Sequence, residues 1–374
     1  MGPWATHILA DYGADVIKVE APGGDIMRFA GTGRHADMGP LFLHANRGKR
    51  SIVLDLKCAA GRTALLDLIA GADVFVHNVR RAAMAKLALR FEDIAAVNPR
   101  AIYASLVGFA SSGPYADRPA YDDLIQGASG LASLLTSPGS GGSPPRVVPA
   151  LLADRIGGIT AAHAILAAVI ERTRTGRGSE VEIPMFETLV ELVLADHFGG
   201  ETFVPPVGPP GYARALADRG PQRSADGYVC VLLYNDAHWE RFFALVGASE
   251  RYRADPHLCD RELRARDYDA AYAIVADYLA LEPTAHWLRE LVAADIPVLP
   301  YHTLDDLSSD PHLVATDFIS EIDHPSEGRI RSLGVPVRHG TGAAWTPGPA
   351  PRLDEHGAAI LAEAGYGPPG GVER

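Results

Sequence analysis

The 374-residue sequence contains only three cysteines, Cys58, Cys230 and Cys259, and none of them lies in a CxxC pair. This spacing excludes both a disulfide framework and a zinc site built on paired cysteines. No apolar run reaches the roughly 18 uncharged residues of a membrane span, and no signal peptide is visible. These absences predict a cytoplasmic protein that needs neither a membrane nor a metal.

Positive charge is also scarce. The chain has 34 lysines and arginines against 46 acidic residues, a net charge of −12. Nucleic acid is therefore not expected as a partner, and an anionic ligand would require a local cluster of cations. HExxH and GxSxG motifs are absent. The stretch "GTGRHA" (31–36) matches a dinucleotide pattern, but it does not directly follow a strand and open a helix, as phosphate binding requires.

The sequence does contain a regular alternation of two patterns in its first half. Short β-branched apolar runs are separated by helical patterns such as "GRTALLDLIAGA" (61–72). This alternation predicts an α/β fold with a parallel sheet. The strands are expected within residues 15–20, 51–56, 74–79, 101–109 and 180–185. A Pro/Gly-rich connector at 203–213 precedes a smaller α+β domain.

Two further features need an explanation. The long helix expected from about residue 152 has Asp154, Gly157 and Gly158 near its start. An aspartate there is a common helix cap, but each glycine weakens a helix by about 1 kcal/mol relative to alanine. The glycines therefore indicate that something lies close to the backbone. A basic cluster at 47–50, where a strand begins, is either a solvated loop or a phosphate-binding patch.

Motifs along nearly the whole chain resemble the class III CoA-transferase family, the CaiB/BaiF superfamily of formyl-CoA transferase and α-methylacyl-CoA racemase. The resemblance rests on "GPWATHILADYGADVIKVE", "NRGKRSIVLDLK", "ADVFVHN", "NPRAIYASLVGF", "GPYADRPAYDDL", "TRTGRGSEVEIPMFE", "DGYVCVLL" and "DPHLVATDF" in this order. It implies an interlocked homodimer with a Rossmann-like large domain and a smaller α+β domain. The expected segments are a large domain at 1–200, a linker at 201–222, a small domain at 223–305 and a return segment at 306–374.

The resemblance also implies an active site. Asp154 matches the carboxylate that carries the acyl group, and a helix N-terminus favours its ionised form. Gly157 and Gly158 would let a thioester lie against the first turn. Tyr121 occupies the position of the racemase histidine, and Asp122 that of a nearby acidic residue in formyl-CoA transferase.

CoA binding is expected from a second group of residues, with CoA as a substrate and no further cofactor. These residues are Arg47, Lys49, Arg50, Asn78, Lys86, Gly157 and Gly158. Asn78 matches the asparagine of the family's "ENF" motif, and Lys86 matches a basic residue near the nucleotide. The family arginine after "VIKVE" is Ala21 here, and a lysine of formyl-CoA transferase aligns with Pro119.

The expected function is transfer of CoA between an acyl-CoA and a free carboxylic acid through an aspartyl acyl-enzyme. A tyrosine with a pKa near 10 is a poor base at neutral pH, so Tyr121 favours a transferase over a racemase. Family members have a strand and an "AG" lead-in before "PWAT" that this chain lacks. A truncated, inactive CoA-binding protein is therefore the other alternative.

Overall fold

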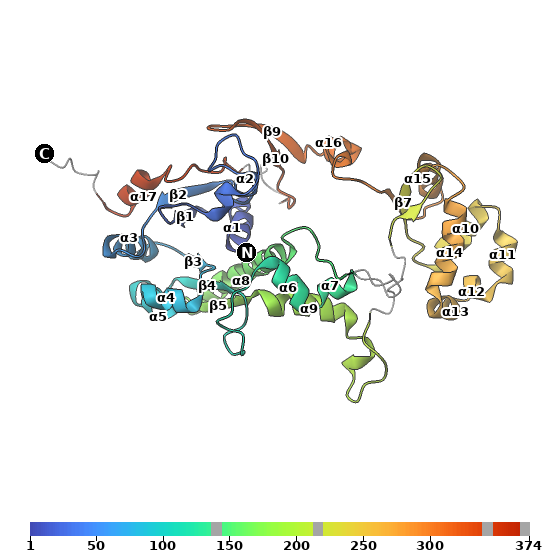
Figure 1. Ribbon diagram of the computed structural model, residues 1–374, viewed down its shortest axis with the longest axis horizontal. Helices are drawn as coiled ribbons and strands as arrows, with labels where there is room; N and C mark the ends of the chain where they lie inside the picture. The colour runs from blue at the N-terminus through green and yellow to red at the C-terminus, as the bar shows by residue number, and fades with distance from the viewer. Residues whose placement is uncertain (136–143, 212–219, 339–346, 367–374) are drawn as a thin grey trace. The chain divides into compact units, whose positions relative to one another are not determined.

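The structure is a computed structural model that describes residues 1–135, 144–211, 220–338 and 347–366. Its contacts divide the chain into two compact units (Figure 1). The first spans residues 1–136, 141–194 and 315–374, and the second consists mainly of residues 195–314. Parts of the expected linker (212–219) and of the expected return segment (339–346 and 367–374) lie outside the described residues.

The first unit alternates helices and strands and then receives the C-terminal part of the chain. Its elements are α1 (Gly2–Asp11), β1 (Val16–Glu20), η1 (Ile26–Phe29), α2 (Pro40–Ala45), β2 (Lys49–Val53), α3 (Ala59–Ala70), β3 (Val74–His77), α4 (Arg81–Leu87), α5 (Phe91–Val97), β4 (Ile102–Val107), α6 (Asp122–Ala128), α7 (Leu131–Leu134), α8 (Leu152–Thr175), β5 (Glu180–Pro184), α9 (Met185–His197), β9 (Ile319–His324), β10 (Gly328–Leu333) and α17 (Gly357–Glu363).

The five strands before α9 pair only in parallel, which confirms the prediction from the α/β alternation. β1 pairs with β2, and β4 lies between β3 and β5. All six residues of β4 are buried, as expected for a strand covered on both faces. The prediction that these strands form a single sheet, however, is wrong. The strands form two separate hydrogen-bonded pieces, because β1 and β3 each use only one edge for pairing.

Helix α8 is the centre of the first unit. Its buried residues are mostly small, including Gly157, Gly158, Ala161 and Ala162, and this face packs closely against α1. Among the described residues, α8 is the one helix long and apolar enough to cross a membrane. One face of α8 is buried in a hydrophobic cluster with Leu106 of β4 and residues of α1 and β5, whereas Ile159 and Ile170 are exposed.

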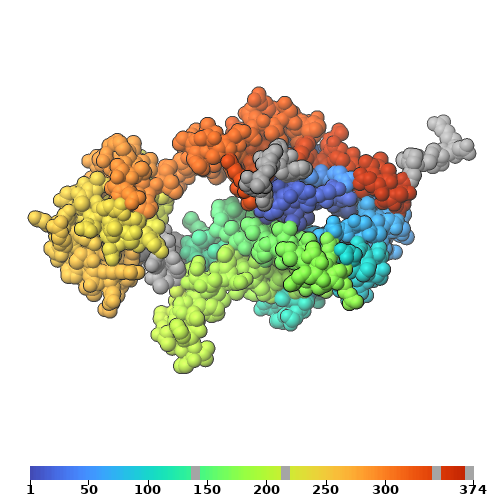
Figure 2. All heavy atoms as spheres, turned by 180° about the vertical axis from the view of Figure 1, so that it is seen from behind, coloured from blue at the N-terminus to red at the C-terminus, as the bar shows by residue number. Residues whose placement is uncertain are grey.

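The C-terminal segment completes the first unit. β9 and β10 form an antiparallel hairpin, and α17 packs against β2. The backbone N–H of His356 donates to the carbonyl of Ser51, and Asp354 accepts from the N–H of Val53. Figure 2 shows this orange and red segment beside the blue N-terminal part of the chain. Ile52 and Ile360, more than 300 positions apart in sequence, thus share one hydrophobic core.

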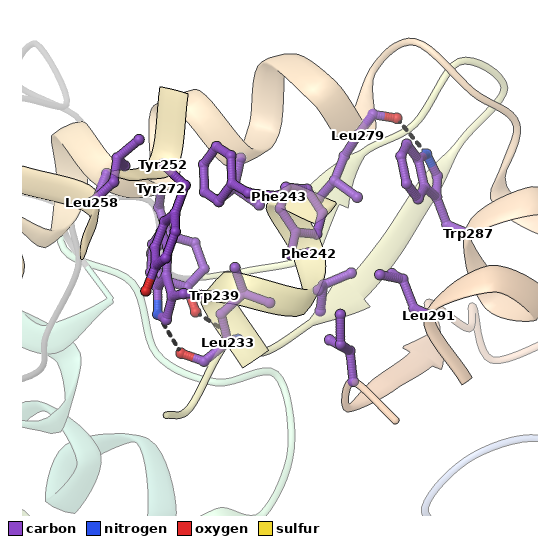
Figure 3. Packing of buried hydrophobic residues seen from close by; sticks show 14 of the residues in the cluster. Leu233, Trp239, Phe242, Phe243, Tyr252, Leu258, Tyr272, Leu279, Trp287 and Leu291 are labelled. Atoms are coloured by element: carbon purple, nitrogen blue, oxygen red, sulfur yellow. Dashed lines mark hydrogen bonds between the residues drawn. The ribbon is translucent and has the colours of Figure 1, made fainter. Parts of the chain in front are cut away.

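The second unit has its own core. Its elements are η2 (Gly199–Thr202), β6 (Gln222–Arg223), β7 (Tyr228–Val231), α10 (Asp236–Leu245), α11 (Ser249–Ala254), α12 (Pro256–Cys259), α13 (Arg261–Arg266), α14 (Tyr268–Leu279), α15 (Thr284–Ala293), β8 (Val298–Pro300), η3 (Asp306–Ser309) and α16 (Pro311–Ala315). β7 lies between β6 and β8 in a small antiparallel sheet. Trp239 and Trp287 are buried and donate to the carbonyls of Leu233 and Leu279, so both indoles are satisfied in an apolar core (Figure 3).

Candidate active site

Asp154 lies in the first turn of α8, where the structure leaves its carboxylate partly accessible. The side chain is 28% exposed. Its Oδ1 accepts from the amino group of Met1 at 2.5 Å, and no described residue donates to its Oδ2. The arrangement therefore presents one free carboxylate oxygen for chemistry.

Asp122 holds the turn that carries Asp154. Leu151 precedes α8 and has no side chain that can cap it. Asp122 of α6 supplies the cap instead, because its Oδ2 accepts from the backbone N–H of Asp154 at 2.8 Å. Asp122 is only 5% exposed, so its carboxylate is largely shielded from water. Asp122 thereby supports Asp154 through the backbone.

Gln126 in turn orients Asp122. This fully buried glutamine donates from Nε2 to Oδ1 of Asp122 at 2.6 Å and accepts at Oε1 from the N–H of Val148 at 2.9 Å. Its Nε2 also reaches the carbonyls of Val148 and Ala150, at 3.2 Å and 3.1 Å. Every polar atom of the amide is used. The loop before α8 is therefore fastened to α6 through one buried network.

The two glycines after Asp154 have a packing explanation. A Cβ at Gly157 would come within 2.2 Å of the Met1 Sδ, and one at Gly158 within 3.0 Å of Trp4 and 3.1 Å of the Met1 carbonyl. What lies close to the α8 backbone is thus α1 of the same chain. The expectation that these glycines leave room for a thioester is not supported, because Met1 and Trp4 fill that space.

Arg155 and Trp4 form a contact beside Asp154 that the sequence patterns did not reveal. The Arg155 guanidinium lies 3.8 Å from the centre of the Trp4 ring. Trp4 also stacks on His7, with ring centres 4.5 Å apart. Burial lowers the pKa of Arg155, while the carboxylates of Asp154 and Asp122 raise it. The signal available in the sequence was only the position of Arg155 directly after the predicted nucleophile.

His7 is an uncharged member of this stack. Burial lowers its pKa to about 3, and the positive charges of Arg47, Lys49 and Arg155 act in the same direction. Its Nε2 lies 3.4 Å from Asp11, and its Nδ1 has no partner among the described residues. The imidazole is therefore neutral at physiological pH, and it is not a general acid in this form.

The expected phosphate patch at 47–50 is not free to bind an anion. Arg47 is buried and forms a bidentate ion pair with Asp11, at 3.1 Å and 2.6 Å. Lys49 is buried and donates to the carbonyls of Pro3 and Ala45 and to Oδ1 of Asn46, at 2.8 to 2.9 Å. Burial lowers the pKa of Lys49 well below its usual value. Both cations hold α1 against α2, which also contradicts the alternative of a solvated loop.

Three other predicted residues lie on the surface. Arg50 donates to Asp15 and Glu363 and so joins β2 to α17. Asn78 is exposed at the end of β3, and its side chain approaches Gly2. Lys86 is exposed in the last turn of α4. Of this group, Asn78 and Lys86 remain available for a ligand.

Tyr121 immediately precedes α6 and is 67% exposed. No described group donates to or accepts from its hydroxyl. Asp122, its neighbour in sequence, is buried and engaged with α8. The structure therefore brings Asp122 and Asp154 together and leaves the Tyr121 side chain outside that network.

Comparison with known proteins identifies the family. The model of CoA-transferase family III matches residues 1–357. The chain is a class III CoA-transferase. It is 32% identical to succinyl-CoA:mesaconate CoA-transferase of Haloarcula hispanica, over 98% of this chain and 93% of that protein. It is 33% identical to acetyl-CoA:oxalate CoA-transferase of Acetobacter aceti, over 97% and 92% respectively.

Solved structures of this family agree with the fold. A CaiB/BaiF family protein from Brucella suis superposes with a TM-score of 0.80 at 30% identity, over 97% of this chain and 95% of that one. The prediction of family, enzyme class and mixed α/β fold from the sequence motifs is therefore confirmed. For this class III CoA-transferase, the arrangement around Asp154 is the candidate active site.

Proposed function

We propose that this enzyme transfers CoA from an acyl-CoA to a short-chain carboxylic acid through an acyl-enzyme on Asp154. The observation that carries the proposal is the position of Asp154. Its carboxylate has one oxygen without a partner among the described residues, and its backbone is held by the buried Asp122. A nucleophile needs this combination of accessibility and fixed position.

The reaction proceeds by exchange of acyl groups without any change of oxidation state. Asp154 attacks the carbonyl carbon of the acyl-CoA, the C–S bond breaks, and a mixed anhydride and CoA thiolate form. The thiolate then attacks the aspartyl carbonyl, giving an aspartyl-CoA thioester and releasing the first acid. The acceptor carboxylate attacks this thioester and forms a second anhydride. Attack by the released thiolate on the acceptor carbonyl yields the new acyl-CoA and restores Asp154.

The acceptor we propose is a short dicarboxylic acid. Two of the similar proteins are named for transfer to mesaconate and oxalate, and a third is a succinate–glutarate CoA-transferase of Agrobacterium fabrum. All of these acids carry a second carboxylate. No metal or redox cofactor enters the proposed steps, and CoA is both substrate and product. Asn78 and Lys86 are proposed to contact the CoA, since both side chains are exposed.

Transfer is favoured over racemisation by the surroundings of Tyr121. A racemase needs two groups that exchange a proton on opposite faces of one carbon. The exposed Tyr121 side chain contacts no described base that would activate it. Transfer requires only one nucleophilic carboxylate. We further propose that the enzyme is cytoplasmic and forms a homodimer; light scattering of the purified protein would test the dimer.

The test is trapping of the acyl-enzyme. Incubation with acetyl-CoA or succinyl-CoA followed by hydroxylamine is expected to convert Asp154 to its hydroxamate, detected by peptide mass spectrometry. Asp154→Ala is expected to lose exchange of labelled CoA while keeping its circular dichroism spectrum. Glu171→Ala is the matched control, because Glu171 is an exposed acid at the opposite end of α8. Normal exchange in Asp154→Ala would show that another residue carries the acyl group.

A further inference from the structure

The Arg155 guanidinium forms no ion pair among the described residues. It is only partly exposed and contacts the face of the Trp4 ring, but it forms neither an ion pair nor a side-chain hydrogen bond with any described residue. Several arginines of the first unit are paired instead. Arg28, Arg47 and Arg172 each donate to a carboxylate. A guanidinium has five donors, and leaving them unpaired in a partly desolvated position is unfavourable.

The position of Arg155 ties it to the reaction centre. It follows Asp154 directly in the first turn of α8. Both side chains face α1, since Asp154 contacts the amino group of Met1 and Arg155 contacts the Trp4 ring. Asp122 is bound to the backbone N–H of Asp154, and both carboxylates act to raise the pKa of Arg155, which burial lowers. An anionic group bound to Arg155 therefore lies beside the nucleophile.

The Trp4 ring fixes where the guanidinium lies. Trp4 contacts both the Arg155 guanidinium and the neutral His7, with which it stacks. Gly158 lets α1 approach closely enough for this contact, because a Cβ there would meet Trp4 at 3.0 Å. A guanidinium stacked on an aromatic ring keeps its N–H groups in the guanidinium plane, where they suit the two oxygens of a carboxylate.

On the basis of the proposed transfer reaction, we propose that Arg155 binds the second carboxylate of a dicarboxylic substrate while the first carboxylate reacts at Asp154. Arg155 is then a specificity-determining residue. It selects acids with two carboxylates over acids of the same shape with one. Two adjacent side chains of α8 thus act on different groups of the substrate. Asp154 attacks the reacting carbonyl, and Arg155 binds the carboxylate that does not react.

The experiment compares each dicarboxylic acid with its monoamide. Acetyl-CoA is the donor, because it carries no second carboxylate, and oxalate, succinate, glutarate and their monoamides are the acceptors. The monoamide retains one reacting carboxylate and nearly the same shape but lacks the second charge. The wild-type enzyme is expected to favour at least one dicarboxylate over its monoamide by about 10- to 100-fold in kcat/KM.

Arg155→Gln is expected to abolish this preference by raising KM for the dicarboxylate, with little effect on the monoamide. Arg155→Lys keeps the charge but loses the planar fork, and it is expected to retain part of the preference. Arg62→Gln is the matched control, because Arg62 of α3 is also partly exposed and has no partner among the described residues. It is expected to leave the preference unchanged.

Several results would overturn the inference without touching the proposed function. One is that the wild-type enzyme does not distinguish the dicarboxylic acids from their monoamides. Another is that Arg155→Gln loses activity equally on both kinds of acceptor. If Arg155→Gln does not fold, Arg155→Lys with full wild-type preference for all three acids would also refute the role of the guanidinium fork. Absence of any CoA exchange or hydroxamate in the wild-type enzyme would instead refute the proposed function, and the inference with it.

Discussion

Replacing Asp122 with asparagine tests whether one buried carboxylate holds the proposed nucleophile, Asp154, in place. Asp122→Asn conserves shape but changes one acceptor oxygen to a donor. Gln126 cannot rotate to compensate, because its Oε1 accepts from the N–H of Val148 and its Nε2 donates to two carbonyls. The asparagine Nδ2 must therefore face either the Nε2 of Gln126 or the N–H of Asp154. In both orientations two donors meet.

The expected loss of stability in Asp122→Asn follows from the hydrogen bonds that the substitution removes or weakens. One charge-assisted hydrogen bond, worth about 1.5–3 kcal/mol, is lost, and the remaining bond becomes a neutral one. Removing the buried charge returns part of this cost. We expect Asp122→Asn to lower the free energy of unfolding by about 2–3 kcal/mol. Because the N–H of Asp154 loses an acceptor or gains a weaker one, CoA exchange is expected to fall by about 10- to 100-fold.

Urea unfolding measures the loss of stability. Hydrogen exchange of a peptide covering residues 150–156 reports the loosened turn directly, and it is expected to become faster in the variant. Asp123→Asn is the control, because Asp123 has the same side chain, lies next in sequence and is exposed. An Asp122→Asn enzyme within about 0.5 kcal/mol of wild type, with unchanged exchange in this peptide, would refute the reasoning.

The basic residues before and in β2 and two buried histidines provide further tests. Lys49→Met and Arg47→Ala are expected to lower the free energy of unfolding by about 2–4 kcal/mol, since each removes buried contacts of α1. A large loss of CoA affinity in well-folded variants would instead support a phosphate-binding role. Burial lowers the pKa of His7 to about 3 and that of His77 to about 4. The unfolded chain therefore binds more protons below pH 6.5, and stability falls with decreasing pH by about 2 kcal/mol per histidine at pH 5. Urea titrations at pH 7.5 and 5 are expected to show a smaller difference for His7→Gln than for wild type, and an equal difference would contradict a neutral buried His7.

Much of the fold follows from local patterns in the sequence. The β-branched runs at 74–79 and 101–109 contain β3 and β4, and the α/β alternation correctly indicates parallel pairing. The ordered motifs identified the family, which the comparisons confirm. Local patterns do not specify which strand edges pair, so the separation of β1–β2 from β3–β4–β5 was not predictable in this way.

The basic cluster shows why site residues are harder to predict. Three cations within four positions look like an anion site because a sequence does not show burial. The partner of Arg47 is Asp11, 36 residues earlier, and one partner of Arg50 is Glu363, 313 residues later. These charges are neutralised by segments that only the tertiary fold brings together. Arg155 shows the converse case, since a single arginine after an aspartate forms no recognisable pattern.

The close packing of α1 on α8 connects the glycines to the proposed chemistry. Gly157 and Gly158 set how near Met1 and Trp4 come to the first turn of α8. Trp4 in turn determines where the Arg155 guanidinium lies, one residue beyond the carboxylate of Asp154. A larger residue at position 158 would displace the ring and with it the proposed receptor for the second carboxylate. The local cost of a glycine pair in a helix is therefore linked to function through packing, because the same contact that joins two helices also orients the group that selects the substrate.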